Sequence, residues 1–117
     1  MLMNQILPNI GALITLALGL LGIVTPNVAA KLVGIEPIGL TGISEVRATY
    51  GGLFVGLGWG CLYSQSPTVF FAVGVACLGA ALGRGVSVLV DRSYAPKNLG
   101  GMLFEASMGA LLLASGL

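Results

Sequence analysis

The sequence predicts an all-α fold, a bundle of four antiparallel transmembrane helices with a short interfacial amphipathic helix between helices one and two. The chain has 117 residues, of which 56% are hydrophobic and 8% charged, whereas a soluble domain carries about 25% charged residues. Four segments are apolar over about the 20 residues that a helix needs to cross a bilayer. Within them apolarity is continuous rather than alternating, which argues against a transmembrane β-barrel.

Four helices and their connections account for residues 1–117 as a single domain. We expect the helices at about residues 4–24, 44–64, 68–91 and 99–117. Residues 65–67 and 92–98 are short connections, which place successive helices antiparallel. We call the end of the bundle with the N-terminus and the 65–67 turn the hairpin end. The opposite end, with the 25–43 and 92–98 connections, is the charged end.

Residues 25–43 form the one long connection, and their first half has the pattern of a short helix. Thr25-Pro26 is a cap residue followed by proline at the first helical position. One face is then polar, with Lys31 and Glu36. The other face is apolar and consists of Val28, Leu32, Val33 and Ile35. This pattern predicts an amphipathic helix at the membrane interface, followed by an irregular stretch. An ordinary linker that is apolar is the alternative.

The charged residues exclude several classes of function. Five Lys and Arg stand against four Asp and Glu, with no His, so the formal net charge is +1. That balance lacks the basic patch that nucleic-acid binding requires. Without His, the chain lacks the commonest general base, the commonest metal ligand and the usual haem ligands. We therefore expect no nucleic-acid partner, no metal and no cofactor, and no catalytic constellation that would identify an enzyme.

Arg84 and Glu105 are the charged residues that fall deepest inside the predicted membrane helices. Arg84 lies seven residues before Asp91, and Glu105 six residues after Leu99, so both lie about 9 to 10 Å inside from the charged end. Each belongs to a stripe of small residues at intervals of four, which lets helices approach closely. An unpaired charge in a helix centre costs roughly 2.5 to 3.5 kcal/mol. The spacing therefore predicts an ion pair between Arg84 and Glu105.

Other polar side chains lie close to the same depth in the predicted membrane and extend the pair into a candidate buried polar cluster. Its members are Glu45, Arg47, Tyr50, Arg84, Ser87, Asp91 and Glu105. Two functions are open for this cluster. The first is a structural latch that fixes helix register, since the acids of the cluster can satisfy its two arginines without any ligand. The second is a proton or ligand site.

Small residues recur every four positions on three helices and predict faces for close helix packing. These packing residues are Ala48, Gly52, Gly56 and Gly60 in the second helix, Ala76 and Ala80 in the third, and Gly101 and Gly109 in the fourth. The face of the second helix meets either another helix of this chain or another subunit. Its glycines miss the spacing of a dinucleotide-binding loop.

Three blocks of sequence carry a resemblance that covers essentially the whole chain. The blocks are Ser44-Glu45-Val46-Arg47-Ala48-Thr49-Tyr50-Gly51-Gly52, then Gly83-Arg84 with Ser87 and Asp91, then Glu105. Together they resemble the domain of unknown function 4345 family, uncharacterised small bacterial integral membrane proteins with four helices. Members usually have Gly after the acid that ends the third helix, whereas this chain has Arg92. The resemblance implies the same four-helix fold and brings no activity, substrate or cofactor.

The cations predict how the bundle is oriented. Lys31, Arg92 and Lys97 lie in connections of the charged end, while the connection of the hairpin end has no Lys or Arg. The positive-inside rule therefore places the charged end in the cytoplasm and both termini outside, for a multi-pass protein of a bacterial inner or thylakoid-type membrane. Aromatic residues around the hairpin end fit an interfacial belt, made of Trp59, Tyr63, Phe70 and Phe71.

Two functional classes remain for a bundle of this kind. The first is a non-enzymatic accessory or oligomer-forming subunit of a membrane assembly, with the Arg–Glu pair as a polar latch. Its expected partners are the lipid bilayer and either copies of itself or a larger membrane-protein complex. The alternative is a minimal transporter or channel that uses the Arg84/Glu105 cluster as a proton or ligand site. Against it, no charge lies toward the hairpin end, whereas a transport path opens to both sides.

Overall fold

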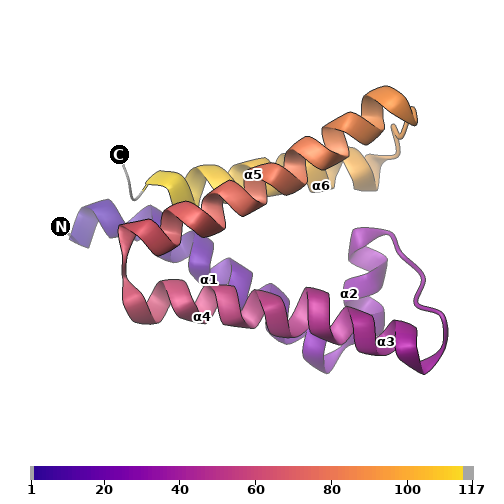
Figure 1. Cartoon of the computed structure of the whole chain (residues 1–117), viewed down its shortest axis with the longest axis horizontal. Coiled ribbons are helices and arrows are strands. Elements are labelled where there is room, and N and C mark those ends of the chain that lie inside the picture. Colours follow the sequence, from indigo (N-terminus) through magenta and orange to yellow (C-terminus); the bar gives the residue numbers. More distant parts are fainter. Residues whose placement is uncertain (1, 115–117) are drawn as a thin grey trace.

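The computed structural model describes residues 2–114 of the chain, and the side chains of residues 5–114. The described residues form helices and no strand, which confirms the all-α class (Figure 1). The helices are α1 (Leu2–Val24), α2 (Pro26–Val33), α3 (Gly39–Arg47), the π-helical turn η1 (Ala48–Gly52), α4 (Leu53–Ser64), α5 (Pro67–Val90) and α6 (Pro96–Leu113). Residues 115–117, the predicted end of the fourth helix, lie outside the described residues.

The second long helix begins five residues earlier than predicted. α3, η1 and α4 follow one another without a break from Gly39 to Ser64, and the junction residues Ala48 and Leu53 both have helical dihedral angles. No proline follows Pro37 in this stretch, so nothing removes a helical hydrogen bond there. α6 likewise begins at Pro96 rather than at residue 99, because a proline at the first helical position sacrifices no hydrogen bond.

The predicted helix between the first two long helices is present as α2. Thr25 is its N-cap, and Gly34 ends it with a φ of 80°, which glycine adopts without strain. Ala29 and Ala30 are buried with Val46 of α3. The larger members of the predicted apolar face remain exposed, namely Val28, Leu32 and Ile35.

The long helices form two antiparallel pairs, α1 with α4 and α5 with α6 (Figure 1). Backbones approach closely in both pairs: a Cβ added at Gly58 would lie 2.7 Å from the Leu16 nitrogen, and one at Gly109 would lie 2.8 Å from Leu78. The pairs meet toward the hairpin end and diverge toward the charged end (Figure 1). Where they meet, a buried core consists of Ala12, Cys61, Phe70, Val73 and Leu112.

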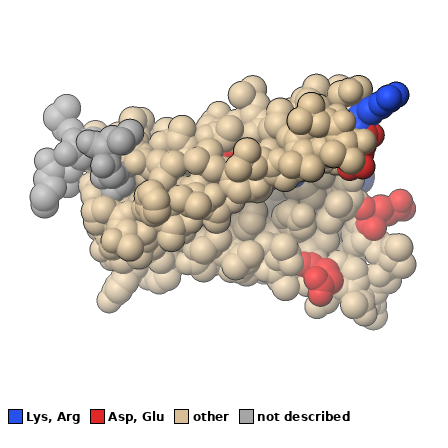
Figure 2. Space-filling view, turned by 45° about the horizontal axis from the view of Figure 1, so that its top comes forward, with Lys and Arg blue, Asp and Glu red and all other residues tan. Residues whose placement is uncertain are grey.

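Much of the apolar surface of the long helices is exposed. Two of the described helices, α1 over Gln5–Val24 and α5, are long and apolar enough to cross a membrane, yet only 33% and 17% of their most apolar stretches are buried. In Figure 2 most of the visible charged side chains gather toward one end of the molecule. Of the aromatic residues predicted to form a belt, Trp59, Tyr63 and Phe71 are exposed, but Phe70 is fully buried because it lies in the core between the pairs.

Candidate functional site

An ion pair between Arg84 and Glu105 joins α5 to α6, as the helical spacing predicts. Arg84 Nε donates a hydrogen bond to Glu105 Oε1 over 2.7 Å, and each side chain is 24% exposed. Gly101, one turn before Glu105, leaves room for the guanidinium, because a Cβ there would lie 3.0 Å from Arg84 Cζ. Charge-assisted hydrogen bonds are roughly twice as strong as neutral ones. The pair therefore connects the two helices through one strong, partly shielded contact.

Asn98 is a third member of this site that the sequence reasoning missed. Arg84 Nη1 donates to Asn98 Oδ1 over 3.2 Å, and Asn98 Nδ2 donates to the Ser93 carbonyl over 3.0 Å. The signal was present in the spacing, since Asn98 lies seven residues before Glu105 and residues seven apart share a helix face. Asn98 therefore links the ion pair to the turn between α5 and α6.

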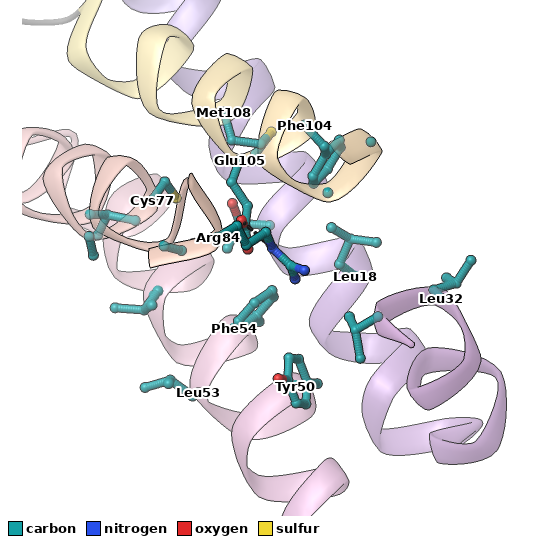
Figure 3. A pocket seen from close by; sticks show the side chains of 18 of the residues that line it. Leu18, Leu32, Tyr50, Leu53, Phe54, Cys77, Arg84, Phe104, Glu105 and Met108 are labelled. Carbon is teal, nitrogen blue, oxygen red and sulfur yellow. Dashed lines mark hydrogen bonds and ion pairs between the residues drawn. The ribbon is translucent and has the colours of Figure 1, made fainter. Parts of the chain in front are cut away.

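The ion pair lies in the wall of a cavity of about 580 Å³ between the two helix pairs. Ligand pockets have volumes of about 300 to 1,000 Å³. Most of the lining side chains are apolar, and they come from all the helices except α3. They include Leu18, Leu32, Phe54, Leu57, Val73, Ala76, Cys77, Ala80 and Met108. Figure 3 shows the Arg84 side chain reaching into the cavity between Leu18 and Phe54. The cavity thus has apolar walls and a charged group near its middle.

The two ends of the cavity differ. Toward the hairpin end, Val73 lines the cavity and belongs to the buried core, which closes this end. Toward the charged end, Leu32 of α2 and Lys97 of α6 line it. Lys97 Nζ donates to the Lys31 carbonyl over 2.7 Å and so ties α2 to α6. The sequence reasoning did not assign Lys97 this contact, because nothing in the spacing brings residues so far apart in the sequence together.

The remaining members of the predicted buried cluster do not join the ion pair in one network, so that prediction is corrected. Ser87 Oγ donates to Asp91 Oδ2 over 2.7 Å, and this contact stays on α5 near the charged end. Asp91 and Glu45 are exposed, and Glu45 lines a separate depression beside α3. Tyr50 lines the cavity and lies against Phe54, with ring centroids 6.1 Å apart. The cluster divides because the helix pairs diverge toward this end.

Arg47 has a different role from the one predicted. Its side chain is exposed, and Nη1 donates to the carbonyl of Ile23 in the last turn of α1. The last carbonyls of a helix have no partner within it, and a cation there also interacts favourably with the helix dipole. Arg47 therefore caps the end of α1, which it reaches because α3 and η1 pack against α1.

The predicted packing residues divide into three groups. Gly109 is buried between α6 and α5, and Gly101 accommodates Arg84. Ala76 and Ala80 were predicted to pack closely against a neighbouring helix, but they are exposed and line the cavity, because α5 faces α6 through Gly74 instead. The residues on the second long helix face outward, with Ala48, Gly52 and Gly56 exposed and Gly60 partly exposed.

The charges at the cavity do not cancel. Arg84 and Lys97 carry two positive charges against the one negative charge of Glu105 among the residues that line it. Within residues 5–114, no group of three Cys, Asp or Glu side chains is placed to hold a metal ion. The site can therefore bind and orient a polar group at one point of an apolar cavity, and it offers hydrogen-bond donors with a net positive charge.

Fold and site define the chain as a small all-α protein of helix pairs, with an Arg–Glu pair in the wall of an apolar cavity. The chain belongs to the family described as Domain of unknown function (DUF4345), whose model matches residues 3–115. Neither the curated proteins nor the solved structures include a match to it. The resemblance stated from the sequence is thereby confirmed, and the family assigns no activity.

Proposed function

We propose that this chain is a multi-pass integral membrane protein whose long helices all cross the bilayer. α1 has 23 residues and α5 has 24, which at 1.5 Å per residue gives about 35 Å each, enough for a hydrocarbon core of about 30 Å. The longest dimension of the structure is 45 Å, comparable with a bilayer including its headgroups. The exposed side chains of α5 toward lipid include Leu82, Val86 and Leu89. An apolar surface of this extent favours a membrane setting.

The orientation proposed from the cations is consistent with this arrangement. Lys31, Arg92 and Lys97 belong to the charged end, which we place in the cytoplasm of a bacterial inner or thylakoid-type membrane. Trp59 and Tyr63 stack with ring centroids 5.9 Å apart at the hairpin end. Exposed aromatic side chains of this kind suit the headgroup region, so the hairpin end and both termini are placed at the outer interface.

Within the membrane, we propose a non-enzymatic role as an accessory or oligomer-forming subunit, with the Arg84–Glu105 pair as a latch between α5 and α6. The observation that carries this proposal is the open face of α4. A Cβ added at Gly56 or Gly60 would have no atom of the described residues within 4 Å, and one added at Gly52 would have a single neighbour, at 3.8 Å. Outward-facing small residues at intervals of four allow another helix to approach closely. Of the two partners left open by the sequence, another subunit is therefore the one we propose.

A minimal transporter or channel is the second candidate, and the cavity is the observation that favours it. An ion pair that is partly exposed in a cavity can exchange a proton or a ligand, because intramembrane ionisable residues are often functional. Toward the hairpin end, however, the cavity meets the buried core at Val73. A path to the hairpin end would have to open this core, so the geometry supports a blind pocket better than a channel.

The oligomer proposal is tested by measuring the mass of the purified chain in detergent by light scattering. We expect an oligomer for the unmodified chain and a shift toward monomer for Gly56→Leu, because a large side chain separates the approaching helices. Gly83→Leu is the matched control, since a Cβ at Gly83 also meets no described atom within 4 Å but lies on α5. A monomeric unmodified chain, or an oligomer that Gly56→Leu leaves intact, would contradict the proposal.

A further inference from the structure

We propose that the cavity binds a single-chain amphiphile with one anionic headgroup, held by Arg84 and Lys97, with its apolar chain directed toward the buried core. This goes beyond the assembly role, because that role concerns the outer face of α4 and this site lies inside one copy. Three properties of the cavity support the proposal: the unused donors of Arg84, the net charge at the wall, and the apolar blind end.

The guanidinium of Arg84 has more donors than its protein partners use. Arginine carries five N–H groups; among the described residues, Glu105 takes Nε–H and Asn98 takes one hydrogen of Nη1. The other hydrogen of Nη1 and both of Nη2 remain for a further acceptor. Figure 3 shows this end of the side chain directed toward the centre of the cavity, between Leu18 and Phe54. A carboxylate or phosphate oxygen is the strongest acceptor for such donors.

The charge balance selects an anion. Arg84, Lys97 and Glu105 leave one net positive charge at the cavity wall. Lys97 uses one of its three ammonium hydrogens on the Lys31 carbonyl, so it also retains donors. Lys97 is exposed, and the Arg84 side chain is 24% exposed, so an anionic headgroup that enters from the charged end can reach both. A single anionic headgroup neutralises the site, whereas a cation would double the excess.

The rest of the cavity requires an apolar chain. Between the ion pair and the buried core, the cavity wall consists of side chains such as Leu57, Val73, Cys77 and Met108. Ordered water needs two to four polar partners, and these side chains offer none of comparable strength. The cavity of about 580 Å³ ends at the buried core, so a chain inserted from the charged end has a fixed depth. A bilayer supplies long-chain carboxylates and phosphates, which share this chemistry.

The proposal is tested by equilibrium binding to the full-length chain, purified in a neutral maltoside detergent at fixed concentration. The radiolabelled probes are palmitate, methyl palmitate and hexadecyl phosphate, which share a chain of 16 carbons and differ in the headgroup. We expect palmitate to bind at one site per chain, about 10- to 100-fold more tightly than methyl palmitate, the range expected when charge-assisted hydrogen bonds are lost. Tighter binding of hexadecyl phosphate than of palmitate identifies a single-chain lipid phosphate as the source, and the reverse order identifies a fatty acid.

Two variants test separately how the cavity recognises the headgroup and how it holds the apolar chain. Arg84→Gln, Lys97→Gln and Glu105→Gln made together remove all three charges of the cavity wall without leaving one unpaired, and this variant is expected to reduce the preference for palmitate over its ester to less than threefold. Ala80→Phe fills the cavity and is expected to abolish binding of all three probes. Ala72→Phe is the matched control on the same stripe of α5, because Ala72 does not line the cavity, and it is expected to bind normally.

Three results would overturn the proposal. Equal binding of palmitate and methyl palmitate would exclude headgroup recognition, and this arm uses the unmodified chain, so no variant needs to fold. Binding that Ala80→Phe and Ala72→Phe reduce equally would place the probe outside the cavity. If none of the three probes binds saturably, the cavity does not bind an amphiphile of this kind. None of these results depends on the oligomeric state, which the mass measurement with Gly56→Leu tests separately.

Discussion

Arg84 Nε lies 2.7 Å from Glu105 Oε1, and this contact is the ion pair that connects α5 to α6 within the described residues. Each partner is 24% exposed, so the pair is partly buried but still accessible from outside the protein. Such a pair stabilises a helix contact less than its Coulomb energy suggests, because desolvation offsets part of the gain. Removing one partner is more costly than removing both, since it leaves a lone charge beside apolar side chains.

The first prediction follows from that asymmetry. Arg84→Gln and Glu105→Gln, made singly, are each expected to destabilise the chain by about 1 to 3 kcal/mol. The double variant is expected to regain at least half of that loss, because two amides can hydrogen bond to each other. Thermal denaturation in one detergent measures all four proteins. Single variants as stable as the unmodified chain would contradict the latch.

The second prediction concerns the turn after α5. Arg92 has a φ of 55°, a left-handed conformation that costs a residue with a side chain about 1 to 2 kcal/mol. Arg92→Gly is expected to stabilise the chain by up to about 1 kcal/mol after the entropy cost of glycine. Arg92→Ala is the control for the lost charge and is expected to give no gain. Equal stability of the two variants, from denaturation midpoints, would count against backbone strain.

The third prediction compares two glycines within long helices. A Cβ at Gly22 would overlap the Tyr50 carbonyl on the adjacent helix, whereas one at Gly79 of α5 meets no described atom within 4 Å. Gly22→Ala is expected to destabilise the chain by about 1 to 3 kcal/mol, the cost of overpacking. Gly79→Ala is expected to stabilise it by up to about 1 kcal/mol through helix propensity. Denaturation midpoints in detergent measure both, and a Gly22→Ala variant at least as stable as the unmodified chain would show that α1 and η1 are not in close contact.

The fourth prediction concerns the contact that ties α2 to α6. Lys97→Met removes the hydrogen bond to the Lys31 carbonyl, worth about 0.5 to 1.5 kcal/mol. Amide hydrogen exchange around Gly34 is therefore expected to accelerate about 2- to 10-fold. Lys31→Met is the matched control, because it removes a charge but keeps the accepting carbonyl, and its exchange is expected to stay unchanged. Identical exchange in both variants would refute the contact.

The sequence predicted the parts of this structure that depend on local spacing. Continuous apolarity identified the long helices, the Thr25-Pro26 pair marked the start of α2, and intervals along two antiparallel helices brought Arg84 to Glu105. These features follow from helical geometry alone. The early start of α3 was missed, because glycine-rich stretches without proline carry no clear boundary signal.

The parts that depend on how the helix pairs are arranged could not be predicted in this way. Tyr50 and Arg84 line one cavity, yet Arg47, close to Tyr50 in sequence, instead caps α1. That separation arises because α5 and α6 diverge from α1 and α4, and a single sequence contains no direct measure of the angle between helix pairs. Asn98 was within reach of spacing arguments, since it shares a face with Glu105, but polar uncharged residues in a short turn are common.

Cysteine accessibility gives the sharpest test of the proposal that the long helices cross a bilayer. Ser66→Cys at the hairpin end and Ser93→Cys at the charged end are made singly in a chain with Cys61→Ala and Cys77→Ala, which removes both free cysteines. A membrane-impermeant maleimide is applied to intact cells. We expect Ser66→Cys to be labelled from outside and Ser93→Cys only after permeabilisation. Labelling of both positions from the same side would contradict the proposal.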